Sequence, residues 1–358
     1  MKAATAYIQL NNLVHNLGIV RTKTANSRVW ATIKANGYGH GLLTVANTLA
    51  FHADGFGVAR LEEALAIRAD SIETPILLLE GFYAAKDLSL LVKHQLQTAV
   101  HCIEQLEALE QAILVRPLRV WLKIDSGMHR IGVRPENVNM FIKRLNACPN
   151  VAKPLHFMSH FSCADELENS VTQKQMIVFF DAIAGQKGYR SLAASSGCFF
   201  WPKSHLDWVR PGICLYGISS VSSITSKILG LKPVMTMTSS LIAIKKIKKR
   251  ESVGYGGRWI AENDTSIGVV AIGYGDGYPY VAPDGTPVII NGRRVPLVGR
   301  ISMDMLTIDL GSYSQDCVGD EVILWGENLP VEEVAAHIGT IGYELVTSIT
   351  SRVNLVYT

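Results

Sequence analysis

The sequence predicts an α/β plus β protein with two domains, an N-terminal (β/α)8 TIM-like barrel and a mainly β C-terminal domain. From about residue 7 to 217, short apolar runs alternate with helix-like stretches, which is typical of a parallel sheet with crossover helices. A count near eight strands over roughly 200 residues fits a closed barrel better than an open sheet. After about residue 230, Gly, Pro and Asp turns separate the apolar runs. We therefore expect a barrel over 1–230 and a β-rich domain over 231–358.

The individual elements follow from the same patterns. Apolar runs bounded by turn residues predict strands, and apolar residues at helical spacing predict helices. In the first domain the expected strands are Val29–Ile33, Gly55–Val58, Ile76–Leu79, Gln97–Val100, Val120–Ile124, Pro154–Met158 and Ile213–Tyr216, and the expected helices include Arg60–Arg68, Ile103–Glu110, Val138–Leu145 and Ser170–Ile183. In the second domain they are the strands Met235–Ile244, Ile267–Ile272, Pro287–Ile290, Met305–Ile308 and Glu321–Leu324 and the helix Val331–Ile338.

Composition excludes several classes of protein. With 48% hydrophobic and 18% charged residues among 358, the chain can build a large core and is not globally disordered. A net charge of +3 gives no argument for nucleic-acid binding. No run reaches the about 18 apolar residues that a membrane span needs, and no signal sequence is evident. The six cysteines form no C-x-x-C pair, so we expect reduced thiols and a cytoplasmic protein.

Lys34 is the first candidate for chemistry. It ends the apolar run Val29–Ile33 and precedes the glycine-rich segment Gly37–Gly41. Burial at a strand end disfavours the ammonium form, which makes a neutral, nucleophilic amine accessible for Schiff-base formation. The alternative is a lysine that simply ends a strand and points to water.

Other polar residues follow expected barrel strands and should share its C-terminal face with Lys34. Arg130, in the turn after Lys123, has the fork geometry that grips a carboxylate, although a surface ion pair is the alternative. His156 and His160 are four residues apart, which admits a metal pair, but no third ligand is compelling. An imidazole stacked on an aromatic ligand is the favoured use of His160.

Two further segments predict a phosphate site. Ala193–Gly197 and Val209–Gly217 fall where the last two strands of a barrel should end, the usual phosphate corner of this fold. A serine hydroxyl and the backbone N–H groups of Gly212 and Ile213 are suited to a dianion. The choice between Ser195 and Ser196 stays open, and Ser195 is preferred from its spacing to Pro202 and Arg210.

The second domain contributes three displayed side chains. Tyr255 and Tyr274 each lie between glycines, in Gly254–Gly257 and Gly273–Gly277, where bulky neighbours that would bury a tyrosine are missing. Met303 lies in the polar loop Gly299–Met305.

Taken in order, these motifs closely resemble the alanine racemase family of fold-type III pyridoxal-phosphate enzymes. That family has a (β/α)8 barrel followed by a β-domain, in agreement with the patterns described above. The resemblance runs through Ala31–Gly41, Lys123–Arg130, Ser159–Phe161, Val209–Gly217, Val253–Trp259, Ile272–Tyr278, Gly299–Met305 and Tyr343-Glu344. The segment Ala194–Gly197 departs from the asparagine-serine pair that is more familiar in the family.

The resemblance implies a role for each site residue. Lys34 would carry pyridoxal 5′-phosphate as a Schiff base and act as one base, and Tyr255 of the partner subunit in a homodimer would act as the other. Lys123 matches a lysine that is often carbamylated, and Tyr274 would line the channel through which substrate enters. The phosphate would be bound by Tyr38, Ser195, Gly212, Ile213 and Tyr343, the pyridine nitrogen by Arg210, the ring face by His160, and the substrate carboxylate by Arg130 and the partner's Met303 N–H.

The implied activity is interconversion of L-alanine and D-alanine, which supplies D-alanine for peptidoglycan. Crowding by Tyr255, Tyr274 and Tyr343 favours a small side chain, although a racemase of broader specificity stays open. A decarboxylase of the same fold is disfavoured, because those relatives carry a glutamate where Arg210 stands. A non-catalytic pyridoxal-phosphate carrier would leave residues 230–358 without a purpose, and a barrel that binds another phosphorylated ligand is the third alternative.

Overall fold

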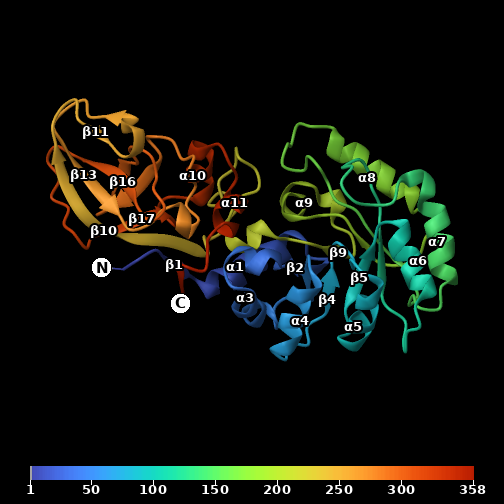
Figure 1. Ribbon diagram of the computed structural model, residues 1–358. Helices are drawn as coiled ribbons and strands as arrows, with labels where there is room; N and C mark the ends of the chain where they lie inside the picture. Colours follow the sequence, from blue (N-terminus) through green and yellow to red (C-terminus); the bar gives the residue numbers. More distant parts are fainter. Residues whose placement is uncertain (1) are drawn as a thin grey trace.

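A computed structural model describes residues 2–358 and has the two predicted parts, an α/β barrel and a β-rich domain that lie side by side (Figure 1). The barrel is closed by eight parallel strands, which follow one another around it in chain order. They are β2 (Arg28–Thr32), β3 (Gly55–Val58), β4 (Ile76–Leu78), β5 (Gln97–Val100), β6 (Val120–Lys123), β7 (His156–Met158), β8 (Arg190–Ser191) and β9 (Trp208–Val209). The predicted barrel is therefore confirmed.

Helices connect the strands and cover the outside of the barrel (Figure 1). The four that we predicted lie within two residues of their expected bounds at each end. The helices are α1 (Leu10–Lys23), α2 (Lys34–Tyr38), α3 (Leu42–Leu49), α4 (Leu61–Ala69), α5 (Leu88–Lys93), α6 (Ile103–Gln111), α7 (Val138–Ala147), α8 (Val171–Ala182) and α9 (Ser195–Phe200), with 3-10 turns η1 (Ala85–Asp87), η2 (Pro135–Asn137), η3 (Pro202–Ser204) and η4 (Ile213–Tyr216). No helix in residues 2–358 is both long and apolar enough to cross a bilayer.

One expected strand was wrong. Ile213–Tyr216 forms the turn η4, and the last two barrel strands are the two-residue segments β8 and β9. All four residues of η4 are buried and none is charged. A short apolar run without alternation does not distinguish a strand from a tight turn. Strands as short as β8 and β9 leave almost no periodic signal.

The second domain is built on an eight-stranded sheet, with the order β15-β14-β17-β10-β1-β18 and with β13 and β16 branching from β10. Its long central strand curves across both parts of the sheet (Figure 1). The strands are β1 (Thr5–Ile8), β10 (Met235–Ile247), β13 (Thr265–Val270), β14 (Pro287–Ile290), β15 (Arg293–Pro296), β16 (Leu306–Gly311), β17 (Glu321–Trp325) and β18 (Asn354–Tyr357). A small ribbon of β11 (Ser252–Val253) and β12 (Trp259–Ile260), the turns η5 (Tyr255–Gly257) and η6 (Tyr274–Asp276), and helices α10 (Val331–Ile338) and α11 (Gly342–Thr347) complete it.

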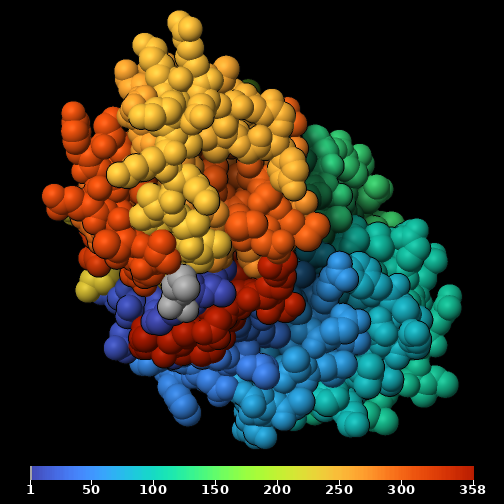
Figure 2. All heavy atoms as spheres, turned by 60° about the vertical axis from the view of Figure 1, so that its left-hand side comes forward, coloured from blue at the N-terminus to red at the C-terminus, as the bar shows by residue number. Residues whose placement is uncertain are grey.

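The first strand of the chain belongs to this second sheet. In β1, Thr5 pairs with Thr238 of antiparallel β10 on one side and with Asn354 of parallel β18 on the other. Figure 2 shows the blue N-terminal segment lying between the yellow-gold start of the β-domain and the red last part of the chain. The β-domain is therefore completed by residues from both ends of the sequence, and α1 leads from it directly into the barrel.

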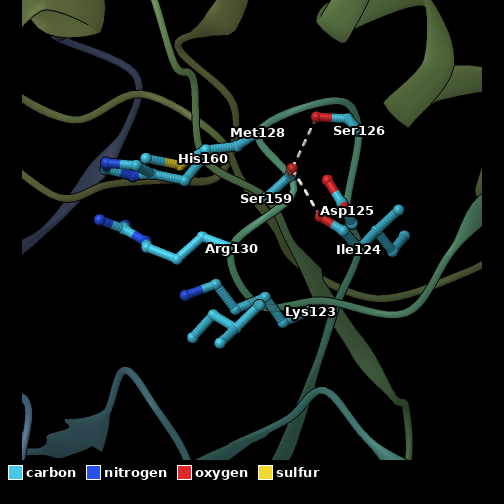
Figure 3. A pocket seen from close by; sticks show the side chains of 9 residues that line it. Lys123, Ile124, Asp125, Ser126, Met128, Arg130, Ser159 and His160 are labelled. Carbon is cyan, nitrogen blue, oxygen red and sulfur yellow. Dashed lines mark hydrogen bonds between the residues drawn. The ribbon is translucent and has the colours of Figure 1, made fainter.

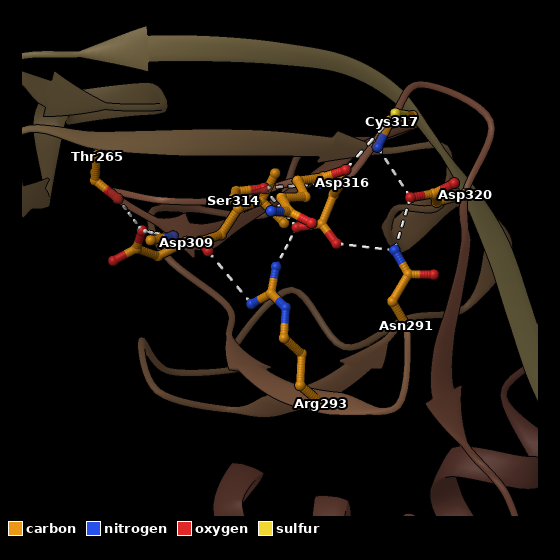
Figure 4. Close-up of polar contacts among 11 residues, drawn as sticks. Thr265, Asn291, Arg293, Asp309, Ser314, Asp316, Cys317 and Asp320 are labelled. Atoms are coloured by element: carbon orange, nitrogen blue, oxygen red, sulfur yellow. Dashed lines mark hydrogen bonds and ion pairs between the residues drawn. The ribbon is translucent and has the colours of Figure 1, made fainter.

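A polar network braces one edge of the β-domain (Figure 4). Arg293 of β15 forms an ion pair with the buried carboxylate of Asp316, and Asn291 donates to Asp316 at 3.0 Å and to Asp320 at 2.8 Å. Asp320 also accepts the backbone N–H of Cys317 at 2.9 Å. These contacts tie the loop before β17 to the β14–β15 hairpin.

Tryptophans fill the barrel interior. Trp30 of β2 stacks on Trp208 of β9 with ring centroids 4.2 Å apart, and Trp121 of β6 meets both edge-on. Gly55 makes room for this cluster, since a Cβ at that position would lie 2.1 Å from Cζ3 of Trp30. The floor of the barrel is thus a packed aromatic plug, as interiors of this fold are filled by side chains.

We expect Gly55→Ala to destabilise the protein by about 1–3 kcal/mol, because the added methyl overpacks a core that has no free space. Gly18→Ala is the matched control: apart from its chain neighbours and the backbone of its own helix α1, no atom lies within 4 Å of the added carbon. Alanine there should stabilise by about 0.5–1 kcal/mol. Urea unfolding of both variants measures the difference, and equal stabilities would contradict the proposed packing.

Candidate active site

The candidate site is a cavity of about 900 Å³ at the C-terminal ends of the barrel strands. In this fold, catalytic and binding residues gather at that face. Ten of the residues singled out from the sequence line this one cavity: Lys34, Tyr38, Lys123, Arg130, His160, Ser195, Arg210, Gly212, Ile213 and Tyr343. The sequence reasoning therefore brought together residues that are up to 309 positions apart.

Lys34 begins a turn with an unusual backbone. Helix α2 is left-handed: φ is 53° at Ala35, 55° at Asn36, 61° at Gly37 and 52° at Tyr38. For residues with a Cβ this conformation costs about 1–2 kcal/mol each. Lys34 and Tyr38 are one turn apart and both line the cavity, so the turn presents an amine and a phenol to the same space.

Hydrogen bonds and close packing hold the left-handed turn. The carboxylate of Glu63 accepts the N–H of Ala35 at 2.6 Å, and Oδ1 of Asn36 accepts the N–H of Leu42 at 2.9 Å. Gly39, next along the chain, lies against α11: a Cβ there would be 1.9 Å from the carbonyl oxygen of Val346. The β-domain thus supports the turn from outside the barrel.

The expected phosphate corner is a compact cradle, formed by the hydroxyl of Ser195 and the backbone of Gly212 and Ile213. Oγ of Ser195 accepts the N–H of Gly212 at 3.0 Å, and a Cβ on Gly212 would lie only 2.5 Å from the hydroxyl of Tyr38. The N–H of Ile213 has no hydrogen-bond partner among residues 2–358. Ser196 instead exchanges a hydrogen bond with Ser220 at 2.9 Å. Ser195 is therefore the serine that contacts the cradle, and Ser220 is a lining residue that the sequence did not reveal.

Two phenols flank this cradle. The rings of Tyr38 and Tyr343 lie 6.2 Å apart. Burial raises the pKa of both hydroxyls far above the usual range of tyrosine. Both therefore stay protonated and are available as hydrogen-bond donors.

Arg210 is buried beneath the cavity and held by three hydrogen bonds. Its guanidinium donates to Oγ of Ser191 at 2.5 Å, to the carbonyl of Ser159 at 2.5 Å and to the carbonyl of Leu192 at 3.2 Å. Burial lowers its pKa to about 10, so it remains charged at neutral pH. Within the described residues its Nε proton has no acceptor, so this proton is among the donors left for a ligand.

Arg210, Arg130, Lys123 and Lys34 make the site strongly cationic. Figure 3 shows Lys123, Arg130 and His160 reaching toward the same side, away from the hydrogen-bonded pair Ser126 and Ser159. Burial, followed by the charges of Arg210 and Arg130, lowers the pKa of Lys123 to about 7. The amine of Lys123 is thus partly neutral at physiological pH.

His160 is kept uncharged by the same surroundings. Burial, and then the charges of Arg210 and Lys123, hold its pKa well below the ordinary value of 6.5. A neutral imidazole at the cavity wall is suited to packing against an aromatic ligand rather than to pairing with an anion.

The loop after β6 positions Arg130. The carboxylate of Asp125 accepts the backbone N–H groups of Gly127 and His129, each at 3.0 Å, and contacts Nδ1 of His129 at 3.0 Å. These bonds close the loop into a tight turn, so that the next residue, Arg130, projects into the cavity.

The structure adds an acidic neighbour, Glu80, that sequence reasoning missed. Oε1 of Glu80, just past β4, lies 4.0 Å from Nζ of Lys34, and its Oε2 accepts the hydroxyl of Tyr83 at 2.8 Å. Asp165 also lines the cavity. A glutamate at the end of an expected strand was the available signal for Glu80.

Three predicted residues do not line the cavity of their own chain. Tyr255 in η5, Tyr274 in η6 and Met303 before β16 lie in the β-domain, with 72%, 41% and 52% of their surfaces exposed. They are available to another molecule.

The two histidines of the metal alternative are separated by the structure. His160 lines the cavity, whereas the ring of His156 packs 4.9 Å from that of Trp121 in the barrel interior and its Nδ1 accepts the N–H of Tyr189 at 3.1 Å. In residues 2–358 no group of three His, Cys, Asp or Glu side chains is arranged to hold a metal ion.

Comparison with known proteins decides the family. Residues 8–220 match the model for the alanine racemase N-terminal domain, and residues 234–357 match that for the alanine racemase C-terminal domain. The chain belongs to the alanine racemase family. It is 60% identical to the alanine racemase of Vibrio cholerae over 357 residues, covering 100% of this chain and 99% of that one.

The alanine racemase of Vibrio parahaemolyticus is 61% identical over 358 residues and the two chains cover each other fully. The fold agrees equally well with the crystal structure of the biosynthetic alanine racemase from Pseudomonas aeruginosa, with a TM-score of 0.97, 43% identity and full coverage of both chains. Membership of the alanine racemase family extends to the β-domain, which disfavours a carrier built on the barrel alone.

Proposed function

We propose that this protein interconverts L-alanine and D-alanine with pyridoxal 5′-phosphate as cofactor, in a homodimer whose sites are shared between subunits. The single observation that carries the proposal is the cavity in which Lys34, the Ser195–Gly212 cradle and Arg210 meet. The family membership and the names of the Vibrio relatives support the same reaction.

The cavity residues fit the cofactor. The free N–H of Ile213 and the protonated phenols of Tyr38 and Tyr343 suit a phosphate, and the missing Cβ of Gly212 leaves room for its approach. The spare Nε proton of Arg210 suits a pyridine nitrogen, and the neutral ring of His160 suits an aromatic face. We therefore assign the phosphate to Tyr38, Ser195, Gly212, Ile213 and Tyr343, and covalent attachment to Lys34.

Racemisation requires a proton to leave one face of the α-carbon and another to arrive on the opposite face. Bound pyridoxal phosphate supplies the electron withdrawal that makes the α-proton of an amino acid acidic. Lys34 supplies a base on one face, and Tyr255 of the partner subunit supplies the base on the other. The exposure of Tyr255, outside its own cavity, supports its delivery to a neighbouring subunit.

Binding of the substrate uses the remaining groups. Arg130 holds the substrate carboxylate, together with the backbone N–H of Met303 from the partner subunit. The guanidinium of Arg210 retains its proton at neutral pH, so it donates a hydrogen bond to the ring nitrogen without transferring a proton. Such a pairing moderates the electron withdrawal, which suits racemisation better than decarboxylation.

Size exclusion explains the preference for alanine. Tyr343 narrows the cavity from within the chain, and Tyr255 and Tyr274 arrive from the partner, with Tyr274 lining the channel through which substrate enters. Amino acids with larger side chains are then poorer substrates. The product is D-alanine for peptidoglycan, made in the cytoplasm.

We also propose that Lys123 is carbamylated. Its neutral amine attacks carbon dioxide, a nitrogen–carbon bond forms, and the amine proton leaves to solvent. Burial and the neighbouring guanidinium groups disfavour the ammonium form, and the guanidinium charges stabilise the resulting anion. The anion would face Arg130 and hold it for the substrate.

The reaction is tested by incubating L-alanine in deuterated water with pyridoxal phosphate and analysing product chirality. We expect D-alanine with deuterium at the α-carbon and much slower exchange with L-serine.

Lys34→Ala should abolish both cofactor attachment and exchange, because the amine serves both. Tyr255→Phe should keep the cofactor, and its rate of exchange should fall by about 10²–10⁴-fold in one direction. Unchanged rates in both directions would remove Tyr255 as a base.

Sharing of sites between subunits is tested by mixing Lys34→Ala with Tyr255→Phe protein under conditions that exchange subunits. Each mixed dimer then has one site with both bases intact, so random exchange should restore about a quarter of wild-type racemisation. Each variant alone is the control. Activity that never exceeds the sum of the separate variants would show that both bases come from one chain.

The carbamate is tested by ¹³C NMR under labelled carbon dioxide at constant pressure. The neutral fraction of an amine rises as pH passes its pKa, so the signal should grow between about pH 6 and pH 8 because the pKa of Lys123 is about 7. Lys123→Met should remove it, and the same change at exposed Lys187 should leave it intact. A signal that persists in Lys123→Met would assign the carbamate elsewhere.

A further inference from the structure

Tyr38 depends on a backbone conformation that its own residue type disfavours. It is the last residue of the left-handed turn, with a φ of 52°, and Glu63 and Asn36 hold other parts of that turn. Neither of them contacts the backbone of Tyr38. The side-chain hydrogen bond to the backbone of Tyr38 comes from His40.

His40 is fully buried, and its Nδ1 lies 2.8 Å from the carbonyl oxygen of Tyr38. A carbonyl oxygen only accepts, so the contact requires a proton on Nδ1. Burial lowers the pKa of His40 to about 4, so the ring is neutral and carries that single proton. Its Nε2 is buried and has no hydrogen-bond partner among the described residues. One nitrogen of the ring is therefore used and the other is not.

A second contact connects His40 with the phenol of Tyr38. The ring of His40 lies 4.6 Å from that of Tyr216, and the ring of Tyr216 stacks on that of Tyr38 at 4.7 Å. The hydroxyl of Tyr216 donates to the carbonyl oxygen of Thr32 at 3.3 Å, which fixes the middle ring to strand β2. His40 thus bears on both the backbone and the side chain of Tyr38.

The hydroxyl of Tyr38 can move little without disturbing its contact with Gly212. A Cβ on Gly212 would lie 2.5 Å from the hydroxyl of Tyr38, so the cradle and the phenol are in close contact. A small rotation of the Tyr38 backbone would move the hydroxyl away from Gly212 and Ile213 or into them. Any group that fixes this backbone also sets the geometry of the phosphate cradle.

We propose that His40 is a positioning residue for the cofactor phosphate: its Nδ1–H holds the carbonyl of Tyr38, and thereby keeps the Tyr38 hydroxyl at the cradle. The inference rests on the proposed pyridoxal-phosphate site. It assigns to His40 no contact with cofactor or substrate, since His40 does not line the cavity.

Two substitutions separate the hydrogen bond from packing. In His40→Asn, the amide nitrogen occupies the place of Nδ1 and can donate to Tyr38, although the side chain is smaller. In His40→Gln, the amide nitrogen lies near the place of the unused Nε2, and the side chain fills more of the space. If His40 acts through its hydrogen bond, Asn should be the better replacement. If it acts by filling space, Gln should be the better one.

The measurement is the dissociation constant of pyridoxal phosphate from each full-length chain freed of cofactor, followed by the absorbance of the lysine adduct. Pyridoxal, which lacks the phosphate, is measured in parallel. We expect His40→Gln to bind pyridoxal phosphate about tenfold more weakly than wild type, the loss of one hydrogen bond, and pyridoxal within about twofold. His40→Asn should stay within about threefold for both ligands.

The background Tyr38→Phe completes the test. Without the hydroxyl, His40→Gln should cause little further loss for pyridoxal phosphate, because both changes act on the same contact. Three outcomes would overturn the inference. They are an equal loss of affinity for the two ligands, a larger loss of affinity in His40→Asn than in His40→Gln, and losses that add to that of Tyr38→Phe. Wild-type protein that forms no lysine adduct at all would instead overturn the proposed function.

Discussion

The concentration of positive charge at the mouth of the barrel governs the site. Lys34, Lys123, Arg130 and Arg210 share one cavity, and among residues 2–358 only Glu80 and Asp165 add acidic side chains to its lining. Confined cations are costly to bury, and the protein meets that cost in different ways at each position. Arg210 is bonded to three oxygen atoms, the amine of Lys123 is partly neutral, and His160 carries no charge. The cavity keeps a net positive charge, which favours the binding of anions such as a phosphate and a carboxylate.

Backbone geometry makes that arrangement specific. Left-handed turns are rare in chains of L-residues because the Cβ atoms crowd the backbone. Here the strain in Ala35–Tyr38 is offset by a carboxylate, an amide, a buried imidazole and a glycine packed on α11. The result is that an amine and a phenol, separated by one turn, face the same ligand space. Strain of this kind persists only where surrounding contacts determine it more than once.

Much of this could be predicted from the sequence. Six of the eight barrel strands have apolar runs with clear bounds, and the residues that follow strand ends indicated where chemistry would gather. Arg210 and Gly212 could be grouped with Lys34 only because a barrel brings strand ends together. The roles of Tyr255 and Met303 came from the family resemblance, since nothing in their spacing places them at a cavity.

The rest depends on contacts that periodicity does not encode. Nothing in the letters of Ala35-Asn36-Gly37-Tyr38 reports a left-handed helix, because the stabilising partners Glu63 and Val346 lie far along the chain. The strand Thr5–Ile8 joins a sheet whose other members begin more than 220 residues later. The position of Glu80 after an expected strand places it at the barrel mouth, but its proximity to Lys34 is a tertiary contact. Tertiary contacts of this kind outweigh local preference.

The glycines after the turn make the site depend on the β-domain. Gly39 rests on Val346 and Gly41 on the hydroxyl of Tyr357, the penultimate residue of the chain. Domains fold as the ribosome releases them, so the barrel strands can assemble while the β-domain is still being made. The turn that carries Lys34 nevertheless receives these supports only after the β-domain residues as far as Tyr357 have been made. A chain that lacks the β-domain would therefore have a formed barrel in which the turn at Lys34 is incompletely supported.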